Sequence, residues 1–179
     1  MADRIAVVYS STYGSAKQYA HWIAEETGAH VFSRKGCSAA DLKDYDTIII
    51  GGGILAGSIE GIDFLKRNIK KLENKKILSY AVGLDVFNQD SCNRCLEKNF
   101  TRRIKGIPCF FFPGEYFPEK VTKGDRMLMK LVIGRLDKMS MRTEEQDMLL
   151  DVMKNGGDLK KKEAIEPMMD FLKANNIID

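Results

Sequence analysis

The chain has 179 residues, of which 44% are hydrophobic and 30% charged, and a net charge of +3. This length suits one domain with a substantial core, and the mild charge does not indicate nucleic acid as a partner. No apolar run is long enough to span a bilayer, the N-terminus lacks a signal peptide, and four scattered cysteines exclude a secreted disulfide scaffold, so we expect a cytoplasmic protein.

Predicted strands and helices alternate along the chain. Residues 4–9 (RIAVVY) are an apolar run typical of a buried parallel strand, and residues 15–27 have helical apolar spacing that ends at Gly28. The further predicted elements are strands 29–34 and 46–52, helix 61–75, strands 75–84 and 107–114, and helix 163–177. Because no strand pair is spaced as a hairpin, the pattern predicts an α/β fold with a five-stranded parallel sheet of order 2-1-3-4-5 and helices on both faces.

The predicted fold indicates where a ligand would bind, and one segment of the chain does not fit its alternation of strands and helices. Sheets of this order bind ligands at the carboxyl ends of the strands, beside strands one and three. Between the fifth strand and the last helix, about fifty residues (115–163) are too many for a plain connection. We therefore predict a single domain, residues 1–179, with a helical insert at about 115–163.

The loop after the first strand, residues 10–16 (SSTYGSA), has the chemistry of an anion site. It opens a helix whose first N–H groups are unpaired, its glycine allows close approach, and its hydroxyls supply further donors, so a phosphate is the expected guest. The loop matches neither GxxxxGK[ST] nor GxGxxG. The alternative is an ordinary serine-rich helix cap.

Two later loops are expected at the same sheet edge. Residues 51–58 (GGGILAGS) place three glycines after a buried strand, which would leave the backbone bare for a flat ligand, with Ile54 and Leu55 covering one face of it. Residues 81–85 (AVGLD) could offer backbone N–H groups to the polar edge of a ring. A ligand-free flexible turn is the alternative for residues 51–58.

These loops resemble those of the flavodoxin family. VVYSSTYGSAKQYAHWIAEE is similar to the family's phosphate loop and first helix, and YDTIIIGGGILAGSIEGIDFLKRN to its second loop. The resemblance implies a flavodoxin-like three-layer sandwich that binds FMN. It implies cofactor contacts by Ser11, Thr12, Tyr13, Gly14, Ser15, Ala16, Gly52, Gly53, Ile54, Leu55, Ala56, Gly57, Val82, Gly83, Leu84 and Asp85.

Two departures from the family pattern stand out. Ala16 replaces the threonine that often ends the first loop, and the second and third loops lack the aromatic residue that often stacks on the flavin. The ring face is therefore expected to be open or covered by the insert. The segment EYFPEKVTKGDRMLMKLVIGRLDKMSMRTE resembles the group that includes the menaquinone-dependent protoporphyrinogen IX dehydrogenase.

Within the insert, residues 123–139 are predicted to form a basic amphipathic helix. Its apolar stripe contains Leu128, Leu131, Val132, Leu136 and Met139, with Lys123, Arg126 and Lys130 on the far side and Arg135 within the stripe. We expect Arg126, Lys130 and Arg135 to face a substrate or an anionic membrane surface. The alternative is that the stripe packs on the protein's own core or on a second copy.

No side chains are spaced as a catalytic triad or a carboxylate pair, so the flavin is expected to carry the chemistry and the catalytic residues stay unknown. Cys92 and Cys95 have CxxC spacing without a second pair, which argues against a metal site and leaves reduced thiols or a redox disulfide. Two functions stay open. One is an FMN-dependent oxidoreductase that oxidises a porphyrinogen and reduces a quinone. The other is a flavodoxin-type carrier between redox partner proteins.

Overall fold

The computed structural model describes residues 3–179 and is built on one mixed sheet. Five strands are parallel in the order β2-β1-β3-β5-β6, and short β4 joins β3 as an antiparallel hairpin. These strands are β1 (Ile5–Ser10), β2 (His30–Ser33), β3 (Thr47–Leu55), β4 (Ser58–Ile59), β5 (Lys76–Gly83) and β6 (Cys109–Pro113). The predicted α/β class and parallel order are confirmed, whereas the prediction of no hairpin is wrong.

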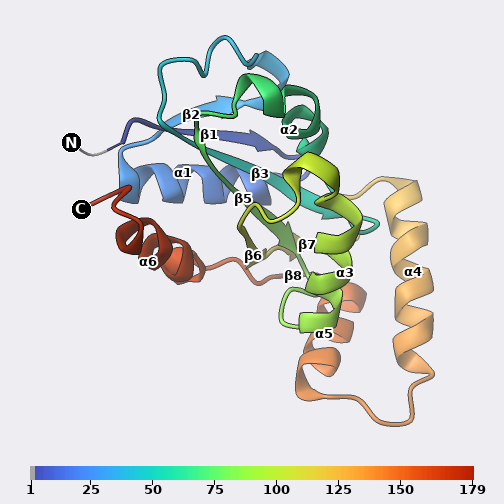
Figure 1. Cartoon of the computed structure of the whole chain (residues 1–179). Helices are drawn as coiled ribbons and strands as arrows, with labels where there is room; N and C mark the ends of the chain where they lie inside the picture. The colour runs from blue at the N-terminus through green and yellow to red at the C-terminus, as the bar shows by residue number, and fades with distance from the viewer. Residues whose placement is uncertain (1–2) are drawn as a thin grey trace.

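Helices cover both faces of the sheet (Figure 1). The helices of the sandwich are α1 (Ser15–Thr27), α2 (Ile62–Asn68), α3 (Gln89–Asn99) and α6 (Glu166–Ala174), with short 3-10 turns at Arg34–Gly36, Ile69–Lys71, Arg102–Ile104 and Lys162–Ile165. Helix α1 occupies its predicted span because Gly14 and Gly28, both left-handed, bracket it. Helix α3 was not predicted, because its sequence QDSCNRCLEKN has few apolar residues to mark a buried face.

Successive side chains of each strand point alternately into two hydrophobic cores, one on each face of the sheet. Ile5 and Val7 of β1 face α1 and α6, whereas Ala6 and Val8 face α2 and α3. In the first core, the buried Tyr19 ring stacks on Phe112 with centroids 4.8 Å apart, and its hydroxyl donates to the Pro113 carbonyl at 2.8 Å. These contacts fix the start of α1 against the carboxyl end of β6, where the candidate site lies.

The segment between β6 and α6 folds as a separate helical pair at the carboxyl edge of the sheet, and the carboxyl terminus lies at the opposite side of the molecule (Figure 1). Its elements are β7 (Glu115–Tyr116), α4 (Lys123–Asp137), α5 (Glu144–Asn155) and β8 (Gly157–Asp158). Strands β7 and β8 pair with each other in an antiparallel ribbon, and α4 packs on α5. No described helix, within residues 3–179, is long and apolar enough to cross a membrane.

Candidate cofactor site

A cavity opens at the carboxyl edge of the sheet, where the three predicted loops meet the insert. It encloses about 130 Å³. Its wall from the sandwich contains Ser11, Tyr13, Ser15, Ala16, Gly53, Ile54, Leu55, Glu60, Val82, Gly83 and Leu84. Its wall from the insert side contains Gly114, Glu115, Tyr116, Phe117, Lys120, Val121, Asp125 and Met129. The two walls are mostly apolar, with polar groups concentrated near the start of α1.

The loop before α1 presents backbone donors to this end of the cavity. Gly14 caps the helix in the left-handed conformation, with φ 101°, and no side chain of the described residues caps the first N–H groups of α1. The hydroxyl of Ser11 accepts from the N–H of Gly14 at 3.0 Å, which closes the loop on itself. The free N–H groups and the helix dipole together favour an anion here.

A carboxylate of the protein already contacts this loop. Both oxygens of the Glu60 carboxylate accept from Thr12, one from its N–H at 3.2 Å and one from its hydroxyl in a short contact. Glu60 follows β4 and is held in place by its own N–H, which donates to the Gly53 carbonyl at 2.9 Å. The loop therefore binds an oxyanion in this structure, although the anion belongs to a side chain.

The three glycines of the second predicted loop lie within β3, and packing excludes a side chain at two of them. A Cβ on Gly51 would lie 1.8 Å from the ring of Tyr80, and a Cβ on Gly52 would lie 2.0 Å from the Glu60 carbonyl oxygen. Only Gly53 lines the cavity, where a Cβ would come within 2.7 Å of the Glu60 carboxylate. The close approach at these glycines is thus made by the protein itself, at Tyr80 and Glu60.

Hydrogen bonds of Tyr13 connect the loop before α1 to the insert. The Tyr13 hydroxyl donates to the Asp125 carboxylate in a short contact and accepts from the Thr122 N–H at 3.2 Å. Thr122 caps α4, because its hydroxyl accepts from the Asp125 N–H at 3.1 Å. One side chain thereby couples the start of α1 to the start of α4 across the cavity mouth.

Charged groups of the insert lie at the cavity rim. Lys120 lies over the Phe117 ring, with its nitrogen 4.0 Å from the centroid. Behind the rim, the largely buried Lys160 pairs with Glu115 and with Asp158, the latter at 3.1 Å. Burial raises the pKa of Tyr116, a phenol that lines the cavity.

A second cavity of about 300 Å³ shares Ile54, Gly83 and Leu84 with the first. It extends toward α3 and contains Gly57, Asp85, Cys92, Cys95 and Lys98 in its wall, among other residues. Burial raises the pKa of both cysteines, which is the opposite of the lowered pKa of reactive thiols. The CxxC pair is therefore a pair of buried, reduced thiols in this structure.

A comparison with protein families identifies the family to which this chain belongs. A family model for the flavodoxin domain matches residues 6–147, which is more than half of the chain. The chain belongs to the flavodoxin domain family. No curated protein sequence matches the chain significantly.

Solved flavodoxin-like structures resemble the chain at low sequence identity. A WrbA-like flavodoxin protein from Agrobacterium tumefaciens has a TM-score of 0.45 and 16% identity, over 69% of this chain and 88% of that one. A flavoprotein in complex with FMN from Lactobacillus acidophilus has a TM-score of 0.42 and 14% identity, over 63% of this chain and 93% of that one. Oxidised flavodoxin 2 from Bacillus cereus has a TM-score of 0.39 and 16% identity, over 76% of this chain and 99% of that one.

The residues fit the phosphate end of a flavodoxin cofactor more directly than its ring end. Thr12 already holds a carboxylate, so its N–H and hydroxyl suit an oxyanion. The cavity volume of about 130 Å³ is below the roughly 300–1,000 Å³ of typical small-molecule sites. A ligand as large as FMN would extend beyond this cavity, toward the second one that shares Ile54, Gly83 and Leu84 with it.

The structure brings most of the predicted cofactor contacts of this flavodoxin domain together. Those that line the cavity are Ser11, Tyr13, Ser15, Ala16, Gly53, Ile54, Leu55, Val82, Gly83 and Leu84. Thr12 and Gly14 lie in the same loop as the lining residues, Gly57 and Asp85 line the second cavity, and buried Gly52 and exposed Ala56 line neither. Their roles toward a cofactor remain predictions.

Sequence reasoning missed Glu60 and most of the insert wall. Glu60 follows the second loop by only a few residues, but nothing local marks a carboxylate that reaches a loop 48 positions earlier. Tyr116 was detectable, since it is the first tyrosine after the third loop, and Phe117 follows it directly. Both residues line the cavity wall on the insert side, and whether the ring face is open or covered by the insert stays a prediction.

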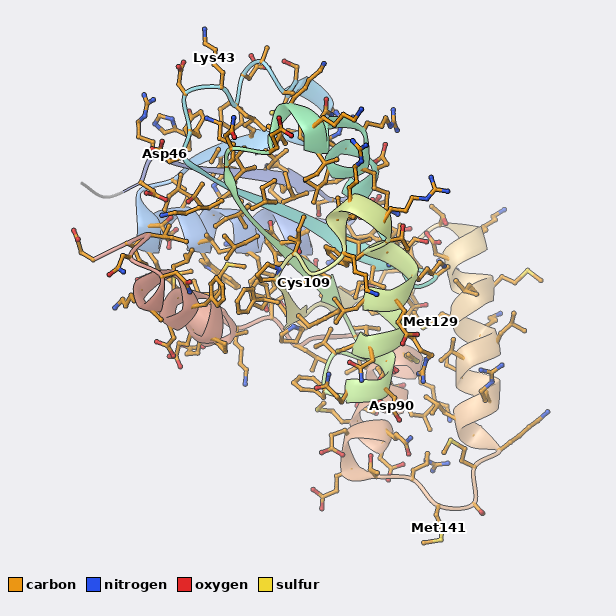
Figure 2. All side chains as sticks on the ribbon, viewed as in Figure 1. Lys43, Asp46, Asp90, Cys109, Met129 and Met141 are labelled. Atoms are coloured by element: carbon orange, nitrogen blue, oxygen red, sulfur yellow. The ribbon has the colours of Figure 1, made fainter. Side chains whose placement is uncertain are left out.

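The predicted apolar stripe of the insert helix is largely exposed, whereas packing on the protein's own core was the alternative. Leu128, Leu131 and Val132 are exposed, and the helix instead buries part of Met129, Ile133 and Leu136. Met129 lies on the side of α4 toward the sandwich (Figure 2).

Among the basic residues of this helix, Arg126 faces inward, with its Nε buried, whereas Lys130 and Arg135 are exposed. The prediction that Arg126 lies on the far side together with Lys130 is wrong, because both sides of the helix are apolar and periodicity alone does not separate them.

Proposed function

We propose that this protein binds FMN in the cavity and works as an FMN-dependent oxidoreductase. The observation that carries the proposal is a loop that holds an oxyanion at the start of α1, within a chain of the flavodoxin domain family. Residues 11–16 would hold the phosphate through N–H and hydroxyl donors. Bound FMN would supply transfer of electrons and hydride.

The other loops would orient the ring and shield it. Gly83, whose Cβ would lie 3.0 Å from Ile54, leaves the backbone of residues 82–85 open toward the two cavities. Backbone N–H groups there would bind the polar edge of the ring. Ile54 and Met129, from opposite walls, would exclude water from its faces.

The insert wall supports an enzyme that acts on a flat, partly apolar substrate. Tyr116, Phe117 and Met129 make this wall apolar, and Lys120 adds a cation at the rim. A porphyrinogen is a large apolar ring system with carboxylate side chains, which suits such a surface. We therefore propose an activity like that of protoporphyrinogen IX dehydrogenase, with a quinone as acceptor.

The outer side of α4 supports contact with a membrane that holds such a quinone. Met127 and Leu131 are 68% and 66% exposed, and Lys130 and Arg135 are exposed on the same helix. An exposed apolar row beside cations suits the surface of an anionic bilayer. Arg126 would instead act toward the cavity side, because its Nε is buried near Tyr116.

A second candidate is an electron carrier that docks on a partner protein. The same exposed row on α4, together with Met141 at 85% exposure in the α4–α5 turn (Figure 2), would serve as the docking surface. A carrier needs no small-molecule substrate, so turnover separates the two functions.

The first experiment is the visible absorption spectrum of the purified protein, followed by acid release and chromatography of the pigment. Released FMN supports the cofactor proposal. A colourless protein that also fails to bind added FMN contradicts it. Turnover of protoporphyrinogen IX with a menaquinone analogue then distinguishes the enzyme from the carrier.

Two methionines of α4 test the role of the insert wall. Met129→Ala enlarges the cavity and is expected to lower porphyrinogen turnover at least tenfold while FMN stays bound. Met127→Ala, two residues away on the exposed side, is the matched control and should leave turnover unchanged when a water-soluble quinone analogue is used without membrane. Equal effects of the two variants would contradict a substrate role for this wall.

A further inference from the structure

The Glu60 carboxylate lies where a bound phosphate would need its donors. It takes the N–H and the hydroxyl of Thr12, and it lines the same cavity as Ser11, Tyr13 and Ser15. A phosphate at the start of α1 would compete for these two donors. Because the loop offers only neutral donors, its capacity for negative charge is small.

The charge of Glu60 has no direct ion-pair partner: within residues 3–179, its carboxylate forms no ion pair with a lysine or arginine. Two anions side by side on neutral donors repel each other, so the phosphate and the carboxylate exclude one another.

The backbone around Glu60 holds this side chain in reach of the loop. Its N–H donates to the Gly53 carbonyl at 2.9 Å, and the Glu60 carbonyl sits so close to Gly52 that a Cβ there would lie 2.0 Å away. The carboxylate is thus an intramolecular ligand, with an effective concentration on the order of millimolar or more. A free anion from solution has to outcompete it.

From these contacts we infer that Glu60 is a specificity-determining residue that closes the phosphate loop to free anions. Only a phosphate carried by a ligand that also fills the rest of the cavity displaces it, because the ring and chain of that ligand add their own binding energy. Inorganic phosphate has no ring or chain to add such binding energy. The FMN part of this inference rests on the proposed function, whereas the part on inorganic phosphate does not.

The test compares Glu60→Gln with the protein itself. Glutamine keeps the length of the side chain and an oxygen for Thr12 but removes the charge. We expect Glu60→Gln to bind FMN at least tenfold more tightly, by fluorescence titration, with riboflavin affinity unchanged because riboflavin lacks the phosphate. Glu73→Gln, an exposed site at the amino end of β5, is the matched control for the change in net charge.

A second arm uses inorganic phosphate and needs no flavin. At 10 mM phosphate, we expect a rise in the midpoint of thermal unfolding for Glu60→Gln and for Glu60→Ala, and none for the unchanged protein or Glu73→Gln. Unchanged or weaker FMN binding by Glu60→Gln, or an equal phosphate effect in all four proteins, would overturn the inference. If no protein binds flavin, the proposed function fails and the phosphate arm still decides the role of Glu60.

Discussion

Replacing Gly51 by alanine is expected to destabilise the fold strongly, although both residues are small. The added Cβ would lie 1.8 Å from the Tyr80 ring, which is fully buried. The ring has no room to move, because it stacks near Phe112 with centroids 5.5 Å apart and its hydroxyl donates to the Ala16 carbonyl at 2.7 Å. Gly51→Ala must therefore displace a core ring and its anchor at the start of α1.

The size of the effect follows from these two losses. Overpacking a core costs about 1–3 kcal/mol, and a buried hydrogen bond lost with it costs about 1 kcal/mol. We expect the free energy of unfolding to fall by about 2–4 kcal/mol, which for a chain of this size lowers the midpoint of thermal unfolding by roughly 5–15 °C. Urea unfolding followed by circular dichroism measures the free energy directly.

A double-mutant cycle can refute this reasoning. In a Tyr80→Leu background the clashing ring atoms are absent, so Gly51→Ala should cost less than half as much. Gly134→Ala is the control, since nothing lies within 4 Å of its Cβ and alanine favours a helix by about 1 kcal/mol. A loss below about 0.5 kcal/mol for Gly51→Ala, or the same loss in both backgrounds, would show that Tyr80 is not the reason for this glycine.

Three further predictions concern the insert and the ionisable groups. Tyr13→Phe removes the ties to Asp125 and Thr122, so limited proteolysis within the insert should speed up while global stability falls by only about 1 kcal/mol; unchanged cleavage would contradict the tie. Lys160→Met leaves Glu115 unpaired and half-buried and should cost about 2–3 kcal/mol in urea unfolding, with Lys160→Arg largely restoring stability. Burial raises the pKa of Cys109 from 9.0 to about 12, so the folded state keeps a proton that the unfolded chain loses. The resulting stability is fully present below pH 9 and is lost as the pH rises toward 12, by about 1 kcal/mol between pH 8 and 10, and Cys109→Ala should remove this loss.

The sheet and α1 were predictable because their signals are local. Continuous apolar runs mark parallel strands buried on both faces, and the two left-handed glycines around α1 fix its ends within a single window of sequence. The hairpin of β3 and β4 was missed, since Ala56 takes a positive φ of 49° that its residue type does not suggest. The family resemblance added the FMN expectation, which periodicity could not supply.

The site was predictable by region but not by contact. The three loops converge as parallel topology requires, whereas the partners of Gly51 and Gly52 are set by packing across strands and loops. The glycine run indicates close approach but not what approaches. The contact between Thr12 and Glu60 likewise depends on the path of the hairpin, and only three-dimensional structure reveals it.

The short ribbon of β7 and β8 has a consequence for how proteins of this kind can diversify. Where the insert leaves the sandwich and where it returns, the chain is joined by pairing of Glu115 with Asp158 and by a 3.0 Å hydrogen bond from the Leu159 N–H to the Gly114 carbonyl. A segment closed at its base can be lengthened, shortened or exchanged by evolution at little entropic cost to the sheet. Natural selection could thus change one wall of the cavity while inheriting the other intact.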